Sequence, residues 1–194
     1  IITGAGKAFS AGHDLKDIQK GERPPEPHFQ AKTIQALAEL PQPVVACVRG
    51  HCYTGGLELA LAADIIIAAR SAKFGDTHSK WGLSPLWGMT QRLPRRVGLS
   101  KAKQMMFTSD IFAAETAERV GLVDICVDDA ELEQATNDLA QRISANSTYS
   151  NQVNKALLAA TDGMTGQAGL AYELAHSPGA CFDAHERVAS FGKK

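Results

Sequence analysis

The sequence predicts an α/β fold, because strand-like and helical segments alternate along its first half. Residues 44–48 and 65–68 are continuously apolar, as in strands that are buried on both faces of a sheet. Segments with helical spacing of apolar residues separate the strands, and glycine or proline clusters mark the turns. We therefore expect an α/β core in residues 1–127 and a helical region in residues 128–194.

Four segments precede the predicted strand at residues 44–48. Residues 1–3 are strand-like and lead into a glycine-rich loop, and residues 21–27 form a polar, proline-rich loop. Residues 30–40 predict a helix with one buried face. Its apolar positions are Ile34, Leu37 and Leu40. Because the chain opens inside a buried strand, we expect the leading strands of the fold, and any targeting segment, to lie upstream of this sequence.

The central segment joins strand 44–48, a glycine turn at Gly55 and Gly56, and a helix at 57–62. Glycine lets the backbone approach a ligand closely, and the first N–H groups of a helix have no partner within it. Such a turn can stabilise a developing negative charge, such as an oxyanion. Glu58 lies about one helical turn beyond Gly55, so its carboxylate can act on the same ligand. A polarising backbone beside a base suits proton transfer next to a carbonyl.

The last third of the chain is helical in character. Residues 129–146, 151–160 and 167–176 predict helices, and Asp128 or Asp129 is available to cap the first of them. The apolar face of that first helix consists of Leu132, Ala135, Leu139 and Ile143. Apolar helix faces in a region outside the α/β core predict association into an oligomer.

The composition is that of an ordinary globular protein and excludes several classes of partner. The 20 basic and 21 acidic residues nearly balance, so no surplus of positive charge indicates nucleic acid. The longest apolar stretch, 57–69, is interrupted by Glu58 and Asp64 and is too short to cross a bilayer, so we expect no membrane insertion. Four scattered cysteines indicate reduced thiols, and we expect a cytoplasmic location.

Three segments carry distinctive motifs in a fixed order along the chain. The first is residues 2–15, Ile-Thr-Gly-Ala-Gly-Lys-Ala-Phe-Ser-Ala-Gly-His-Asp-Leu. The second is residues 50–67, with the glycine pair and Glu58, and the third is residues 74–97, with Thr-Gln-Arg-Leu at 90–93. Together these segments resemble the enoyl-CoA hydratase/isomerase (crotonase) superfamily. The helical tail is also similar, through Gly-Ala-Cys-Phe at 179–182, so the resemblance covers nearly the whole chain.

The resemblance implies a crotonase-like spiral of β-β-α units whose trailing helices build trimers and often hexamers. It implies an acyl-CoA substrate, as in fatty acid metabolism and β-oxidation, with coenzyme A arriving as part of that substrate. We therefore expect no separate cofactor and no metal.

The resemblance also assigns an oxyanion hole. By motif position, the backbone N–H groups of His13 and Gly55 polarise the thioester oxygen. The side chain of His13 takes no part in this, although its bulk narrows the pocket there. The residues expected beside the CoA moiety or the substrate are Ala11, Gly12, Asp14, Leu15, Gly56, Trp81 and Trp87. Asp14 also fits as the N-cap of a helix that begins at Leu15.

The expected catalytic residues are Glu58 and His78. Glu58 matches the first of the two glutamates in the hydratases of the family, but His78 stands where the second belongs. A histidine, with an ordinary pKa of about 6.5, can donate a proton or hold the reacting water. If the loop turns back, Asp76 would orient the imidazole. A second departure is residues 85–89, Pro-Leu-Trp-Gly-Met, where hydratases of the family usually have a small, glycine-rich stretch. Trp81 and Trp87 should therefore reshape the acyl end of the site.

Hydration of a 2-enoyl-CoA thioester is the first hypothesis. Isomerisation between 3-enoyl and 2-enoyl thioesters by Glu58 alone is the alternative within enzymes. Loss of the second glutamate also leaves open a catalytically weak acyl-CoA-binding subunit. For His78 the plain alternative is a surface or structural histidine.

Two other motifs are rejected and one stays open. Gly6-Lys7 lacks the preceding glycine and the following Ser or Thr of a phosphate-binding loop. Cys47, His51 and Cys52 do not have the spacing of a zinc site. The basic stretch from Arg92 to Lys103 is typical of a solvated face, although contact with CoA phosphates is conceivable.

Overall fold

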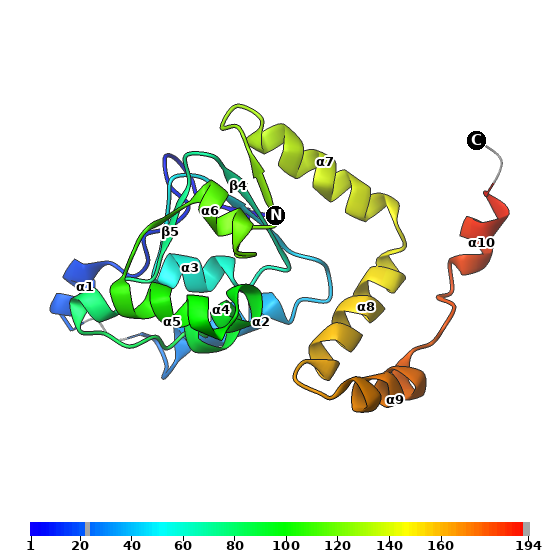
Figure 1. Cartoon of the computed structure of the whole chain (residues 1–194). Coiled ribbons are helices and arrows are strands. Elements are labelled where there is room, and N and C mark those ends of the chain that lie inside the picture. Colours follow the sequence, from blue (N-terminus) through cyan, green and yellow to red (C-terminus); the bar gives the residue numbers. More distant parts are fainter. Residues whose placement is uncertain (22–23, 192–194) are drawn as a thin grey trace. The chain divides into compact units, whose positions relative to one another are not determined.

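A computed structural model describes residues 1–21 and 24–191 (Figure 1). The chain divides into two compact units. The first comprises residues 1–40 and 44–138, and the second comprises residues 41–43 and 139–194. The proline-rich loop expected at 21–27 falls partly outside the described residues, at 22–23.

The first unit contains a four-stranded parallel sheet in the order β1-β2-β4-β7. The strands are β1 (Ile2–Thr3), β2 (Val45–Val48), β4 (Ile65–Ala69) and β7 (Ile125–Val127). The first three confirm the predicted strands, and β7 was not predicted. Every residue of β2 is buried, which is why its sequence has no polar alternation.

A second, three-stranded sheet has the order β3-β5-β6. Its strands are β3 (His51–Tyr53), β5 (Lys73–Gly75) and β6 (Phe112–Ala113). β3 follows β2 directly in the chain, and β5 follows β4, so each turn of the chain adds one strand to each sheet. Ser10 extends the pattern by bridging Cys52 in parallel. This repetition is the predicted spiral of β-β-α units.

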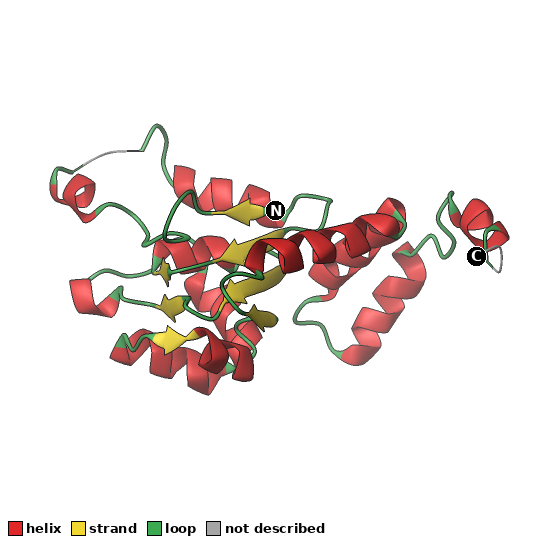
Figure 2. Ribbon diagram, turned by 90° about the horizontal axis from the view of Figure 1, so that it is seen from above, coloured by secondary structure: helices red, strands yellow, loops and turns green. Residues whose placement is uncertain are grey.

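Helices follow each pair of strands and flank the sheets (Figure 2). They are α1 (Leu15–Gln19), α2 (Phe29–Ala38), α3 (Gly55–Ala60), the 3₁₀ turn η1 (Ser79–Trp81), α4 (Met89–Val97), α5 (Leu99–Thr108) and α6 (Ala114–Arg119). α2 and α3 confirm the helices predicted at 30–40 and 57–62. Asp14 caps α1 by accepting a hydrogen bond from the backbone N–H of Lys16 at 2.8 Å, as predicted.

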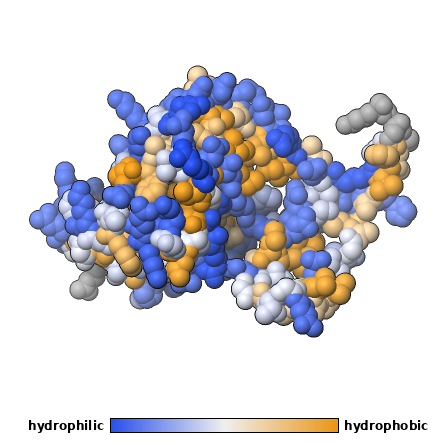
Figure 3. All heavy atoms as spheres, in the orientation of Figure 1, coloured by the Kyte–Doolittle hydropathy of each residue, from blue (hydrophilic) through white to orange (hydrophobic). Residues whose placement is uncertain are grey.

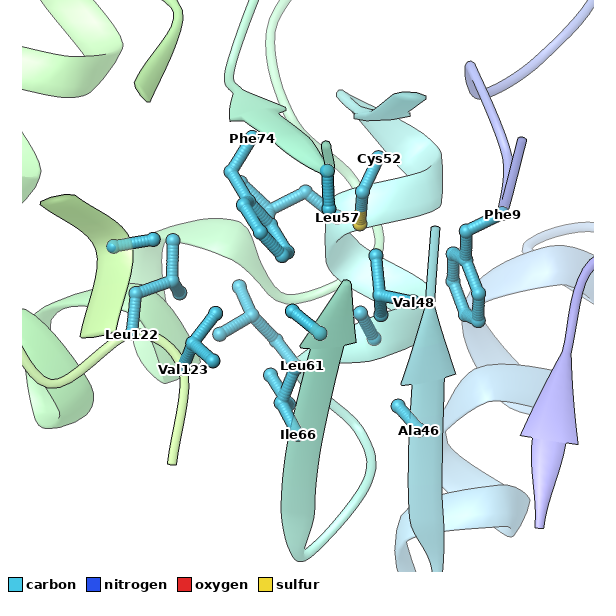
Figure 4. Packing of buried hydrophobic residues seen from close by; sticks show 14 of the residues in the cluster. Phe9, Ala46, Val48, Cys52, Leu57, Leu61, Ile66, Phe74, Leu122 and Val123 are labelled. Carbon is cyan, nitrogen blue, oxygen red and sulfur yellow. The ribbon is translucent and has the colours of Figure 1, made fainter. Parts of the chain in front are cut away.

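One hydrophobic core holds the two sheets and α3 together (Figure 4). Ile66 from β4, Phe74 from β5 and Leu57 from α3 are fully buried in it. Because large side chains of both sheets and of α3 are buried together, their packing fixes where α3 begins. The packing of α3 therefore positions the glycine turn and Glu58 against the core.

The second unit is helical. Helix α7 (Leu132–Ala145) ends in it, and α8 (Thr148–Thr161), α9 (Gly166–His176) and α10 (Ala184–Ala189) follow. The three predicted helices are thus confirmed. Hydrophobic residues lie at the surface of this unit (Figure 3). Across the described residues, no helix has the length and apolarity that a membrane span requires.

The expected capping of α7 by Asp128 or Asp129 is wrong. α7 begins only at Leu132, and the two carboxylates are engaged elsewhere. Asp128 accepts a hydrogen bond from Arg70 Nε at 2.7 Å, and Asp129 accepts one from the backbone N–H of Ser71 at 3.0 Å. Arg70 and Ser71, in the turn after β4, therefore bind the two carboxylates that we expected to cap the helix.

Truncation of Ile66 should destabilise the protein strongly. Its side chain is fully buried in the core, so Ile66→Ala leaves a cavity and should lower the free energy of unfolding by about 2–5 kcal/mol. Leu99→Ala is the matched control because Leu99 is 61% exposed, and it should change stability by less than about 0.5 kcal/mol. Urea unfolding followed by circular dichroism measures both. Equal effects would contradict this description of the core.

Candidate active site

The carboxylate of Glu58 is held in place by backbone groups of another segment. Glu58 lies in the first turn of α3 and is 1% exposed. Its Oε1 accepts hydrogen bonds from the backbone N–H of Trp87 at 2.8 Å and of Met89 at 3.0 Å. The other oxygen, Oε2, lies 3.9 Å from His78 Nε2. One oxygen is thus fixed, and the other faces His78.

Burial raises the pKa of Glu58 above its usual value. The N–H groups of Met89 and Trp87 and the charge of His78 lower this pKa, and the charge of Asp76 raises it further, but desolvation is the largest effect. A carboxylate in this state is a stronger base than one in water. Perturbation of this kind is common among acid/base groups of active sites.

His78 is 8% exposed and makes two contacts with Asp76. Its Nδ1 lies 2.5 Å from Asp76 Oδ1, and its backbone N–H donates to the same oxygen at 3.2 Å. Burial lowers the pKa of His78, but the hydrogen bond and charge of Asp76, with the charge of Glu58, raise it more in total. The net shift is upward, which favours the imidazolium form.

The expected oxyanion-hole residues come from a loop and from the start of α3, which lie against each other. A Cβ built on Gly12 would lie 3.0 Å from the backbone nitrogen of Gly55, so the loop before His13 touches the start of α3. Gly56 packs still more closely, because a Cβ there would lie 2.2 Å from the carbonyl oxygen of Ser10. Only glycine allows these approaches. The structure therefore brings the backbone at His13 and at Gly55 together.

The turn before α3 has an unusual backbone conformation. Thr54 has φ 53° and ψ −115°, outside the regions that non-glycine residues normally occupy. Two hydrogen bonds hold it there. Its N–H donates to the carbonyl oxygen of Gly75 at 2.9 Å, and its hydroxyl lies 2.6 Å from that of Thr77. Such strain is concentrated at functional sites and lies here directly before Gly55.

A cavity of about 290 Å³ unites these groups. His13, Gly55, Glu58, His78 and Trp87 all line it, so both predicted catalytic residues and both oxyanion-hole residues share one space. The remaining lining residues are Ile18, Pro24, His28, Gln30, Ala31, Leu83, Ser84 and Leu86. None of these eight was assigned to the site from the sequence. Ile18 lies in α1, Gln30 and Ala31 lie in α2, and the others lie outside the helices and strands.

The two tryptophans have different positions. Trp87 lies against Gly55, where an added Cβ would be 2.2 Å from its ring, and its centroid is 6.1 Å from that of His13. Trp81 does not line the cavity; it is 53% exposed, and the ammonium of Lys80 lies 5.7 Å from its ring centroid. Only Trp87 therefore shapes the site in this structure.

The expected CoA-side residues lie at the edge of the site. Ala11, Gly12, Asp14 and Leu15 do not line the cavity, and Leu15 is 44% exposed. Gly56 is buried against Ser10 and acts through packing. Ala11, Gly12 and Asp14 belong to the loop that contains His13, and Leu15 begins the short helix α1 that follows it.

The basic stretch is largely engaged within the first unit. Arg92 Nη1 donates to the carbonyl oxygen of Trp87 at 2.8 Å, and Arg96 Nη1 donates to Asp124 at 2.9 Å. Arg92 thereby braces the same loop that binds Glu58, a role that the sequence did not reveal. Among the described residues, no cluster of three His, Cys, Asp or Glu side chains is arranged to hold a metal ion.

Comparison with known proteins shows which family the chain belongs to. The sequence model of the family described as enoyl-CoA hydratase/isomerase matches residues 1–187. The chain belongs to the enoyl-CoA hydratase/isomerase family. Within this family it is similar to a crotonyl-CoA hydratase of Syntrophomonas wolfei subsp. wolfei, at 37% identity over 100% of this chain and 77% of that protein. A probable peroxisomal enoyl-CoA hydratase of Arabidopsis thaliana is 35% identical over 75% of this chain and 55% of its own length.

Solved structures of the enoyl-CoA hydratase/isomerase family have the same fold. An enoyl-CoA hydratase from Bacillus anthracis superposes with a TM-score of 0.91 at 33% identity, covering 98% of this chain and 76% of that one. Relatives at similar identity include proteins named as other enzymes. A 1,2-epoxyphenylacetyl-CoA isomerase of Escherichia coli is 34% identical over 98% of this chain and 76% of that protein. Family membership therefore does not determine which reaction is catalysed; the side chains of the site have to be considered for that.

Replacement of Glu58 should stabilise the fold at neutral pH. The pKa of Glu58 is raised in the folded state, so its contribution to stability is present below the unfolded-state pKa and is lost as pH rises through the folded-state pKa. Glu58→Gln keeps an oxygen for the N–H groups of Trp87 and Met89 without the buried charge. Its urea midpoint should exceed that of the wild type at pH 7, and the difference should shrink near pH 4.

The exposed Glu131 supplies the control for this comparison. Glu131→Gln should leave the midpoint unchanged at both pH values. A lower midpoint for Glu58→Gln at pH 7 would contradict the proposed cost of burying the Glu58 carboxylate.

Proposed function

We propose that this protein hydrates 2-enoyl-CoA thioesters. The observation that carries the proposal is the position of Glu58, a buried carboxylate with one fixed oxygen, in the same cavity as the backbone at Gly55 and His13. That arrangement provides a base beside a place for an oxyanion. The named hydratases among the relatives support the same reaction.

In the proposed reaction, the N–H groups of His13 and Gly55 bind the thioester oxygen and stabilise the enolate-like charge that develops there. Each such donor typically contributes about 3 kcal/mol to lowering the barrier. The charge is created when water attacks C3 of the enoyl group. Coenzyme A enters as part of the substrate, and the proposed reaction needs no redox step.

Glu58 takes a proton from the attacking water as the new C3–O bond forms. His78 breaks its Nε2–H bond and gives that proton to C2, so water is added across the double bond. Afterwards Glu58 holds one proton more and His78 one fewer, and exchange with solvent restores both. The raised pKa of His78 and the nearby carboxylate of Glu58 support this division of roles.

Isomerisation between 3-enoyl and 2-enoyl thioesters is the second candidate. It needs one base that removes a proton from one carbon and returns it to another, and Glu58 is the one carboxylate among the described residues that line the cavity. A chain that binds acyl-CoA without turnover is the third candidate. The experiment below separates all three.

We also propose that the protein acts as a homo-oligomer, a trimer or a hexamer. The support comes from large apolar side chains that the helical unit leaves exposed. They are Leu158 at 73%, Leu170 at 57%, Leu174 at 76%, Phe182 at 75% and Val188 at 72%.

Crotonyl-CoA in buffered D2O tests the proposed reaction. Hydration should remove the absorbance of the conjugated thioester and place deuterium at C2. Glu58→Gln should lower kcat by about 10²–10⁴-fold, and His78→Ala by about 10²-fold, because each removes an acid/base group. Glu131→Gln is the control and should keep full activity.

Absence of hydration by the wild type, with binding of the thioester intact, would overturn the hydratase assignment. Conversion of a 3-enoyl-CoA by the same preparation, lost in Glu58→Gln, would then establish the isomerase. Binding of both thioesters without turnover of either would establish the binding role.

A further inference from the structure

A buried carboxylate stands behind His78. Asp76 is 1% exposed and follows directly after β5, two residues before His78. Its Oδ1 contacts both the ring Nδ1 and the backbone N–H of His78. Its Oδ2 is also buried and has no hydrogen-bond partner among the described residues. A carboxylate so placed is costly unless a nearby cation compensates it.

His78 is the group positioned to compensate that charge. With Nδ1–H donating to Asp76 Oδ1, the ring is fixed and Nε2 is left on the side of Glu58. The 3.9 Å between Nε2 and Glu58 Oε2 is longer than a hydrogen bond. Both atoms therefore remain available to a third group in the cavity that His78 and Glu58 line.

We propose that Asp76 is a positioning residue that fixes the imidazole through Nδ1 and presents Nε2–H to the cavity, so that Asp76 and His78 act together as the proton donor. This inference rests on the proposed hydration. In the step itself the Nε2–H bond breaks and the C2–H bond forms. Nδ1–H stays on His78, and Asp76 keeps its negative charge throughout. The pair would thus supply the second acid/base function with two side chains.

The electrostatics around His78 agree with this geometry. The charged groups that face it are Asp76, from the segment after β5, and Glu58, from α3. Within residues 1–21 and 24–191, His13 and His28 are the other titratable side chains that line the cavity. Burial lowers the pKa of His78, and the two carboxylates raise it more. Removing the charge of Asp76 should therefore lower the pKa of His78.

The test is an NMR titration of the whole protein with ¹⁵N-labelled histidine, in the wild type and in Asp76→Asn. The His78 signals are assigned by their loss in His78→Gln. Asp76→Asn should lower the pKa of His78 and disturb the Nδ1–H tautomer, because asparagine carries no charge and can present its N–H instead of its oxygen. Asp124→Asn is the control, since Asp124 binds Ile66 and Arg96 and does not line the cavity.

Kinetics then distinguish positioning from a merely structural role. Asp76→Asn should lower kcat for crotonyl-CoA hydration about 10²-fold with little change in KM, and should move the alkaline limb of the kcat profile to lower pH. In the His78→Gln background the same change should cost little more, because the two residues act as a unit. If Asp76 had only a structural role, Asp76→Asn would instead lower kcat by the same factor in the His78→Gln background as in the wild type.

An unchanged titration and tautomer of His78 in Asp76→Asn would overturn the inference, whatever the activity. Additive losses in the double variant would overturn it as well. Failure of the proposed function has a different signature. In that case the wild type hydrates no 2-enoyl thioester, while the titration still shows Asp76 controlling His78.

Discussion

The two hydrogen bonds from the backbone of Trp87 and Met89 to Glu58 Oε1 are the interaction on which the rest of the site depends. They tie α3 to the start of α4 and compensate part of the cost of burying a carboxylate. They also decide which oxygen of Glu58 is left for chemistry. Because these donors are backbone groups, side-chain rotation does not move them, and the fold itself sets the geometry of the Glu58 carboxylate.

The same bonds constrain the neighbouring backbone. With its N–H on Glu58, Trp87 places its ring against Gly55, and no side chain other than hydrogen fits there. Arg92 holds the carbonyl of Trp87 from the other side. A side chain at position 55 is thus excluded for two reasons. The Trp87 ring occupies the space, and the backbone N–H of Gly55 has to stay accessible. A single packing arrangement links the base, the cavity wall and the expected oxyanion hole.

Much of this architecture could be predicted from the sequence. Strands β2 and β4 were predictable because each is a continuously apolar segment. Strands β3 and β5 have three residues each, which is too short for a recognisable hydrophobic pattern. Helix α4 was missed because Gly88 precedes it and Pro94 lies within it. Glu58, His78, Gly55 and His13 were found by motif and do share one cavity. The hydrogen bonds from Trp87 and Met89 to Glu58 were not predictable, because every residue except proline has a backbone N–H and its partner cannot be read from the residue type.

The central claim is that the backbone at Gly55 and His13 polarises a thioester carbonyl beside Glu58. The most direct test is isotope-edited infrared spectroscopy of [1-¹³C]crotonyl-CoA bound to Glu58→Gln, which should bind the thioester with little turnover. Two hydrogen bonds to the carbonyl oxygen weaken the C=O bond, so its stretching band should move to lower frequency than that of the free ligand. A bound ligand whose carbonyl band stays at the position found in water would contradict the account.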